Sequence, residues 1–206
     1  ESVLQAIVKD LSERDYQQTA GDVGFHYLVE ALSRHGCHDV ICKLLNRREQ
    51  GSYGFMLDRG WSALPEAWEA ATNESMNHCM LGHIQQWFYQ CVLGITQAED
   101  SIAFEKITIK PAFETGLEWA EGHYDSIRGR IGSKWRRRGK EIHLEVTIPP
   151  NTTATVHLPV DSIEGLRVNN EPLERAQHLE VQRNDKTGIV LSIQSGTFKI
   201  TAGLRP

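Results

Sequence analysis

The sequence lacks the features of membrane and secreted chains. No apolar run approaches the roughly 20 residues that cross a bilayer, so we expect no membrane interaction. No basic start precedes an apolar segment, so no signal peptide is visible and the compartment is left open. The first residue is Glu1 rather than methionine, which indicates a processed product or an excised piece.

Excess positive charge is also missing. The chain has 22 Lys and Arg against 27 Asp and Glu, which gives a formal net charge of −5. A nucleic-acid binder needs a clustered positive face, so nucleic acid is not an expected partner. The one basic run, Lys134–Lys140, has a single aromatic at hand, Trp135, and is typical of a solvated hairpin end.

Cysteine is sparse, and no pair has the CxxC spacing. The four cysteines are Cys37, Cys42, Cys79 and Cys91. Cys37 and Cys42 lie near His35 and His38, which resembles half of a zinc ligand set, but structural zinc needs a second half that the sequence does not offer. Free thiols buried in helices are the favoured interpretation, and no metal or cofactor is predicted.

Helical periodicity runs from Glu1 to about Asp100. The apolar stripe of the first segment consists of Val3, Leu4, Ile7, Val8 and Leu11. A loop bracketed by Gly21 and Gly24 leads to a second helix that ends at Gly36. A third helix is predicted over 37–50, a glycine-framed extended connection over 51–60, and a fourth helix from Ser75 or Asn77 to about Leu93.

From about Phe104 the hydrophobic period changes to two. Residues 141–150 place Ile142, Leu144, Val146 and Ile148 on one face. Turn signals at Asn169-Asn170 and Ser195-Gly196 separate further short strands, a pattern typical of an antiparallel sandwich. We therefore predict two domains, 1–103 and 104–206, that pack together without a flexible linker.

Residues 60–83 hold the candidate chemistry. Pro65 fits a first helical residue, so a helix start would account for Glu66 and Glu69 by the helix dipole alone. The nearby indoles of Trp61 and Trp68 favour a carbohydrate site instead, because sugar rings stack on indoles. Glycoside hydrolysis needs two carboxylates, so Glu66 would be half of that machinery.

Two histidines follow in the same stretch. His78 is either a satisfied histidine of a cap region or a group that binds a ligand hydroxyl. His83 lies five positions further, about 140° round a helix, so the two do not share a face and a two-histidine metal site is not expected. The glycine pair at 21–24 lacks the spacing of a phosphate-binding loop.

Several of these segments together resemble a known family. "TAGDVGFHYLVEAL", "GSYGFMLDRGWSALPEAWE", "SMNHCMLGHIQQWFYQCVLGI" and "ITIKPAF" with "GLEWAEGHYDSIRGRIGSKW" occur in the order seen in α-L-rhamnosidases, glycoside hydrolase family 78. The resemblance covers residues 17 to at least 160. It implies the C-terminal part of an (α/α)6 catalytic barrel followed by an antiparallel β-sandwich.

The resemblance also implies an activity. Family members remove terminal α-L-rhamnose with inversion, so a rhamnose-containing glycoside is the implied partner. The glutamate of "PEAW", Glu66, would be the general base, and His78 would contact rhamnose; Trp61 and Trp68 join them as substrate-binding candidates. Leu64-Pro65 and the short stretch from Glu66 to His78 differ from the usual pattern.

The implied enzyme is incomplete in this chain. The family's general acid lies in earlier barrel helices that have no counterpart here, so the chain alone is expected to be inactive. Helix faces meant for absent neighbours would be exposed, which predicts self-association. Two alternatives stay open, a non-catalytic carbohydrate-binding module and a protein-interaction module.

Overall fold

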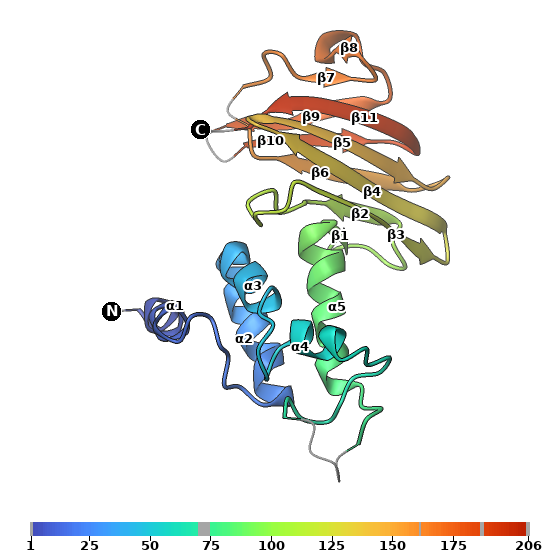
Figure 1. Cartoon of the computed structure of the whole chain (residues 1–206). Coiled ribbons are helices and arrows are strands. Elements are labelled where there is room, and N and C mark those ends of the chain that lie inside the picture. Colours follow the sequence, from blue (N-terminus) through green and yellow to red (C-terminus); the bar gives the residue numbers. More distant parts are fainter. Residues whose placement is uncertain (1, 70–74, 161, 186–187, 205–206) are drawn as a thin grey trace. The chain divides into compact units, whose positions relative to one another are not determined.

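The computed structural model describes residues 2–69, 75–160, 162–185 and 188–204. Contacts divide the chain into two compact units: Glu1–Trp87 with Glu114–Gly116, and Phe88–Phe113 with Leu117–Pro206. The first holds α-helices and the second holds β-sheets (Figure 1). The change of hydrophobic period therefore marks a real change of architecture. The division between the units lies N-terminal to the domain boundary predicted at 103.

Five α-helices lie in the described part of the first unit. They are α1 (Val3–Glu13), α2 (Asp22–Arg34), α3 (His38–Leu45), α4 (Tyr53–Asp58) and α5 (Ile84–Trp87), the last preceded by a 3-10 helix (Met80–His83). Ser2 starts α1 with a capping box, because its hydroxyl accepts from the Gln5 N–H while the Gln5 side chain accepts from the Ser2 N–H. The first three predicted helices are confirmed, although α2 begins inside the expected loop and α3 ends at Leu45.

Three other local predictions for this unit are wrong. Residues 51–60 are not extended, because Ser52 caps α4 by accepting the N–H of Phe55 at 3.2 Å. Pro65 does not start a helix, since the described residues around it are bends and turns. The helix expected from Ser75 or Asn77 begins only at Met80, and a π-helical turn, Phe88–Val92, ends this run of the chain.

The core of the first unit gathers around α2. Phe25 is 1% exposed, and its ring contacts Trp68 edge-on and Tyr53 in a tilted arrangement. Leu32 and Leu81 are fully buried in the same unit. An aromatic cluster therefore ties α2 and α4 to the segment that carries Glu66.

The residues described in the second unit form two sheets. The five-stranded sheet has the order β1 (Ile95–Gln97), β2 (Lys106–Ile109), β6 (Thr153–Leu158), β10 (Gly188–Ile193), β9 (Leu179–Asp185). The six-stranded sheet has the order β3 (Trp119–Ser126), β4 (Gly129–Arg138), β5 (Glu141–Ile148), β11 (Gly196–Gly203), β7 (Arg167–Val168), β8 (Glu171–Pro172). The pairing is antiparallel except between β2 and β6, which run parallel and depart from the predicted pattern.

Alternation decides which face of each strand is buried. Ile142, Leu144, Val146 and Ile148 are at most 2% exposed, which confirms the predicted inward face of β5. Asn169 and Asn170 have positive φ between β7 and β8, as the turn signal predicted. Each sheet buries one apolar face, the arrangement of a sandwich.

Polar anchors fix β4 from its buried side. The Trp135 indole, 1% exposed, donates to the carbonyl of Val92 at 2.7 Å, and the Ser133 hydroxyl donates to that of Leu93 at 2.7 Å. Phe113 packs edge-on against Trp135. Since neighbouring residues point the opposite way, Lys134 and Arg136 are presented on the outer face. Among the described helices, none is long and apolar enough to span a bilayer.

Candidate functional site

Glu66 lies on the wall of a pocket of about 420 Å³ in the first unit. The wall is built from three stretches of chain that the fold brings together: residues 17–22, 50–51 and 66–69. Its acidic members are Asp22, Glu66 and Glu69. The pocket is thus bordered by carboxylates and by the polar side chains of Gln17, Gln18 and Gln50.

Ser75 fixes the position of Glu66. The Glu66 N–H donates to the Ser75 carbonyl at 2.8 Å, and the Ser75 N–H donates to Glu66 Oε2 at 3.3 Å. The side chain itself stays exposed. A carboxylate that is held by Ser75 through the backbone and through Oε2, yet is exposed to solvent, is available to a water or a ligand in the pocket.

Trp68 joins this segment to the core. Its indole is 5% exposed and donates to the carbonyl of Ala20 at 2.9 Å. The ring contacts Phe25 and Tyr53 edge-on, with centroid distances of 5.1 and 5.2 Å. Trp68 therefore links two walls of the pocket, residues 66–69 and 17–22, while most of its ring surface is covered by protein.

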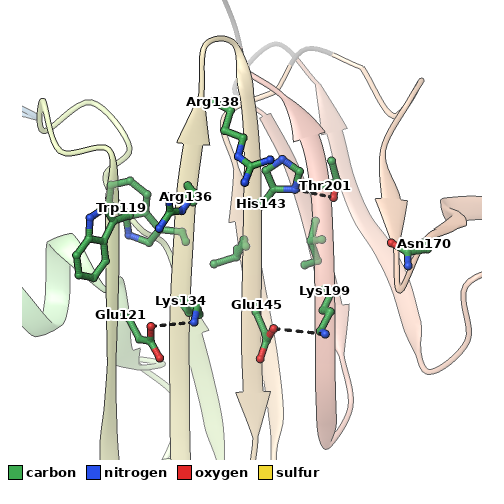
Figure 2. Close-up of a pocket in the computed structure, with 13 residues that line it drawn as sticks. Trp119, Glu121, Lys134, Arg136, Arg138, His143, Glu145, Asn170, Lys199 and Thr201 are labelled. Atoms are coloured by element: carbon green, nitrogen blue, oxygen red, sulfur yellow. Dashed lines mark hydrogen bonds and ion pairs between the residues drawn. The ribbon is translucent and has the colours of Figure 1, made fainter.

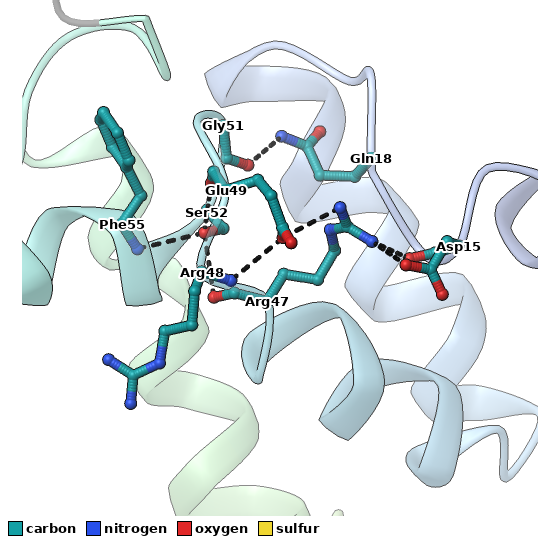
Figure 3. A network of polar contacts seen from close by, with 8 residues as sticks. All are labelled: Asp15, Gln18, Arg47, Arg48, Glu49, Gly51, Ser52 and Phe55. Atoms are coloured by element: carbon teal, nitrogen blue, oxygen red, sulfur yellow. Dashed lines mark hydrogen bonds and ion pairs between the residues drawn. The ribbon is translucent and has the colours of Figure 1, made fainter.

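The third wall is fixed by a polar network around Arg47 (Figure 3). The Arg47 guanidinium donates to the carbonyl and carboxylate of Asp15 and pairs with Glu49 at 2.9 Å. The Ser52 hydroxyl bonds the carbonyls of both Arg47 and Glu49, at 3.0 and 2.7 Å. The amide of Gln18 donates to the carbonyl of Gly51 at 3.4 Å, which closes the network on the pocket side.

Trp61 and His78 do not line this pocket. Trp61 is half-exposed and makes an edge contact with Phe55, with a centroid distance of 5.9 Å. His78 is half-exposed, and its N–H donates to the carbonyl of Leu64 at 2.8 Å. That bond ties the His78 segment to the residues just before Glu66. Of the four predicted site residues, the structure places Glu66 and Trp68 on one pocket.

Two carboxylates of the pocket were not predicted as site residues. Asp22 is the first residue of α2 and accepts the N–H of Val23 at 2.8 Å. It falls within the loop predicted between Gly21 and Gly24. Glu69 was considered only as a helix-start charge. The sequence held no signal for this grouping, because no periodic pattern joins residue 22 to residue 66.

The cysteines and histidines near residue 37 have other contacts. His35 Nδ1 lies 2.8 Å from the Ala31 carbonyl, and His38 Nδ1 accepts the indole N–H of Trp87 at 3.2 Å. Burial, aided by the charge of Asp39, raises the pKa of the Cys42 thiol to about 11. In the part of the chain that the structure describes, no three His, Cys, Asp or Glu side chains are grouped to hold a metal ion.

Two family models match consecutive parts of the chain. Residues 1–92 match the bacterial α-L-rhamnosidase 6 hairpin glycosidase domain. Residues 94–171 match the bacterial α-L-rhamnosidase C-terminal domain. Their order is that of the helical and β units.

Individual relatives agree with the family models. An α-L-rhamnosidase of Formosa agariphila is 28% identical over 211 residues, which cover 98% of this chain and 23% of that protein. The structure of α-L-rhamnosidase from Dictyoglumus thermophilum aligns with a TM-score of 0.81 at 23% identity, covering 98% of this chain and 23% of that one. The crystal structure of Streptomyces avermitilis α-L-rhamnosidase complexed with L-rhamnose gives 0.80 at 24% identity, covering 95% and 19%. The chain thus spans about a quarter or less of these relatives' length.

Proposed function

Because the chain belongs to the bacterial α-L-rhamnosidase family, we propose that it supplies the general base of an enzyme that removes terminal α-L-rhamnose with inversion. Glu66 is the proposed base. The observation that carries the proposal is its position: an exposed carboxylate on a pocket wall, held through its backbone by Ser75. The proposed substrate is a rhamnose-containing glycoside.

The reaction assigns Glu66 a single proton transfer. In an inverting glycosidase the base draws a proton from a water molecule while that water attacks the anomeric carbon. A carboxylic acid roughly 6.5–9.5 Å away protonates the departing oxygen. We place that acid outside this chain, in the remainder of a longer enzyme, so the chain alone does not complete the reaction.

The remaining predicted residues take different roles. We propose that His78 bonds a rhamnose hydroxyl and that Trp61 offers an indole face to the sugar, because both are half-exposed. Trp68 acts as a positioning residue, since its buried indole joins the Glu66 segment to Ala20. Its contribution to substrate binding is thus made through the shape of the pocket.

Uncovered apolar side chains support an incomplete barrel. Val3 on α1 is 79% exposed, Tyr27 on α2 is 63% exposed, and Leu57 on α4 is 69% exposed. We propose that further helices of an (α/α)6 barrel cover these side chains in the longer enzyme. The 206-residue chain alone would cover them by self-association, which sedimentation at rising protein concentration would detect.

The test of the base uses the longer enzyme and two variants. Glu66→Gln keeps the size of the side chain and removes its basicity, so kcat for p-nitrophenyl α-L-rhamnoside should fall about a hundred- to ten-thousandfold. Glu69→Gln is the matched control, because Glu69 is also an exposed carboxylate of the same pocket. The control should retain kcat within a few-fold.

Either of two results would overturn the assignment. One is a Glu66→Gln enzyme with wild-type kcat, and the other is an equal loss in Glu69→Gln. Release of p-nitrophenol by the 206-residue chain alone, abolished by Glu66→Gln, would disprove the separate proposal that the acid lies outside this chain.

A further inference from the structure

The outer face of the six-stranded sheet carries a second pocket, of about 460 Å³ (Figure 2). Four strands contribute to it side by side: β3, β4, β5 and β11. All of its residues belong to the second unit, so it is separate from the pocket that holds Glu66. The reaction proposed above for Glu66 makes no use of this second pocket.

Strand register arranges this face in two rows. The first row places Trp119, Arg136, His143 and Thr201 directly opposite one another on successive strands. The second row lies two positions away along each strand. It places Glu121, Lys134, Glu145 and Lys199 opposite one another in the same way. Opposed residues on one face have Cβ atoms only about 4.5–5.5 Å apart, so each row acts as a continuous strip.

The second row neutralises itself. Lys134 pairs with Glu121 at 2.8 Å, and Lys199 pairs with Glu145 at 3.8 Å. Signs alternate along this row, so it offers no net charge to a ligand. Its exposed ion pairs form a polar border.

The first row keeps its positive charge. Arg136 is exposed and forms no ion pair with any residue that the structure describes, and the same holds for Arg138 at the end of β4. The carboxylate of Glu141 is the acidic group opposite Arg138, and it lies 2.6 Å from His143 Nε2. Two guanidinium groups thus face the pocket with their donors open to a ligand.

An indole stands beside these guanidinium groups. Trp119 is 56% exposed on the edge strand β3, directly opposite Arg136. The core does not need this ring, because Trp135 fills the buried side of the same pair of strands. A large exposed aromatic with its polar neighbours arranged around it is typical of a binding surface.

We propose that this face binds an acidic saccharide. The sugar ring would stack on the Trp119 indole, and its carboxylate would accept paired hydrogen bonds from Arg136, with Arg138 adding charge. Thr201, whose hydroxyl lies 3.4 Å from His143 Nδ1, completes the row as a partner for a sugar hydroxyl. Nucleic acid suits the face less well, because stacking would need several aromatics and the second row holds two carboxylates.

The test is calorimetric titration of the 206-residue chain. The ligand is α-1,4-linked tetragalacturonate, and its neutral counterpart, α-1,4-linked galactotetraose, has a hydroxymethyl group in place of each carboxylate. The acidic ligand should bind at least tenfold more tightly than the neutral one, and added salt should weaken it. A tetrameric thymidine oligonucleotide is the comparison for nucleic acid.

Three variants locate the site. Trp119→Ala and Arg136→Ala should each weaken binding of the acidic ligand about tenfold or more, and Trp119→Tyr should restore most of the loss. Arg137→Ala is the matched control: it removes the same charge from the same strand, but its side chain points to the other face and bonds the Gly139 carbonyl at 3.0 Å. It should bind like wild type.

The outcomes separate the alternatives. Trp119 and Arg136 are exposed, so each variant should keep the circular dichroism spectrum of the wild type. With an unchanged spectrum, a loss of binding reflects the site and not unfolding. Equal binding of the neutral ligand, tighter binding of the oligonucleotide, or no binding would each overturn the proposal. Equal losses in Arg136→Ala and Arg137→Ala would do the same. None of these results bears on Glu66 or on rhamnoside hydrolysis.

Discussion

Replacing Gly54 with alanine would push a methyl group into the carbonyl oxygen of Arg47. An alanine Cβ at this position would lie 2.1 Å from that oxygen and 2.7 Å from Arg48 Cδ, whereas ordinary contact begins at 3.4 Å. The backbone carbonyl cannot simply retreat, because it accepts the hydroxyl of Ser52, the residue that caps α4. The polar network that borders the Glu66 pocket would therefore have to move.

The expected change in the free energy of unfolding combines one stabilising and two destabilising effects. Alanine in a helix is favoured over glycine by about 0.5–1 kcal/mol. Overpacking against fixed backbone costs about 1–3 kcal/mol, and weakening the Ser52 hydrogen bond to Arg47 costs about 1 kcal/mol more. We therefore expect Gly54→Ala to lower the free energy of unfolding by about 1–3 kcal/mol.

Urea unfolding, followed by circular dichroism at 222 nm, measures this loss. The signal reports on the first unit, because α1 to α5 all lie there. Gly82→Ala is the control: its Cβ would meet Leu64 at 3.6 Å, an ordinary contact, so we expect a change within about 0.5 kcal/mol. A Gly54→Ala chain as stable as wild type would refute the reasoning about the network.

Three further predictions concern other parts of the chain. Trp135→Phe should lower the free energy of unfolding by about 1–3 kcal/mol, because the buried Val92 carbonyl loses its donor; a tryptophan-to-phenylalanine chain with an unchanged urea midpoint would contradict this. Burial, with Lys110 and Arg183 adding to it, lowers the pKa of His157, so the unfolded chain takes up the proton first and the second unit should be less stable at pH 5 than at pH 7.5. His157→Asn should reduce that difference, and an equal difference would count against it. At pH 8 maleimide should modify exposed Cys79 well before Cys42, whose pKa is raised to about 11 by burial; peptide mass spectrometry would detect the reverse order.

Periodicity predicted the fold where one face of an element is buried. The inward residues of β5 and the positive-φ turn at Asn169-Asn170 follow directly from the sequence, because alternation and asparagine report local geometry. Residues 51–60 show the limit. Their glycines suggested an extended connection, whereas Gly54 serves a close approach between α4 and the Arg47 carbonyl. A contact between separate segments leaves no local signal.

The candidate site shows the same contrast between local signals and contacts that form only in the folded chain. Glu66 could be singled out from its neighbours Trp61 and Trp68, yet the sequence did not reveal what each indole does. Trp68 is held in the core by Ala20 and Phe25, which lie more than forty residues earlier in the chain. The carboxylate of Asp22 reaches the same pocket from the start of α2. Such partners depend on tertiary packing, which leaves no pattern in the local sequence.

Chemical rescue of the missing base tests the central proposal most directly. In the longer enzyme that we propose, Glu66→Ala would remove the proposed general base, and azide needs no base because it attacks as an anion. With p-nitrophenyl α-L-rhamnoside, we expect azide to restore p-nitrophenol release and to yield β-L-rhamnosyl azide, the inverted product. No rescue by azide, or an α-configured azide product, would contradict the assignment of Glu66 as the base of an inverting reaction.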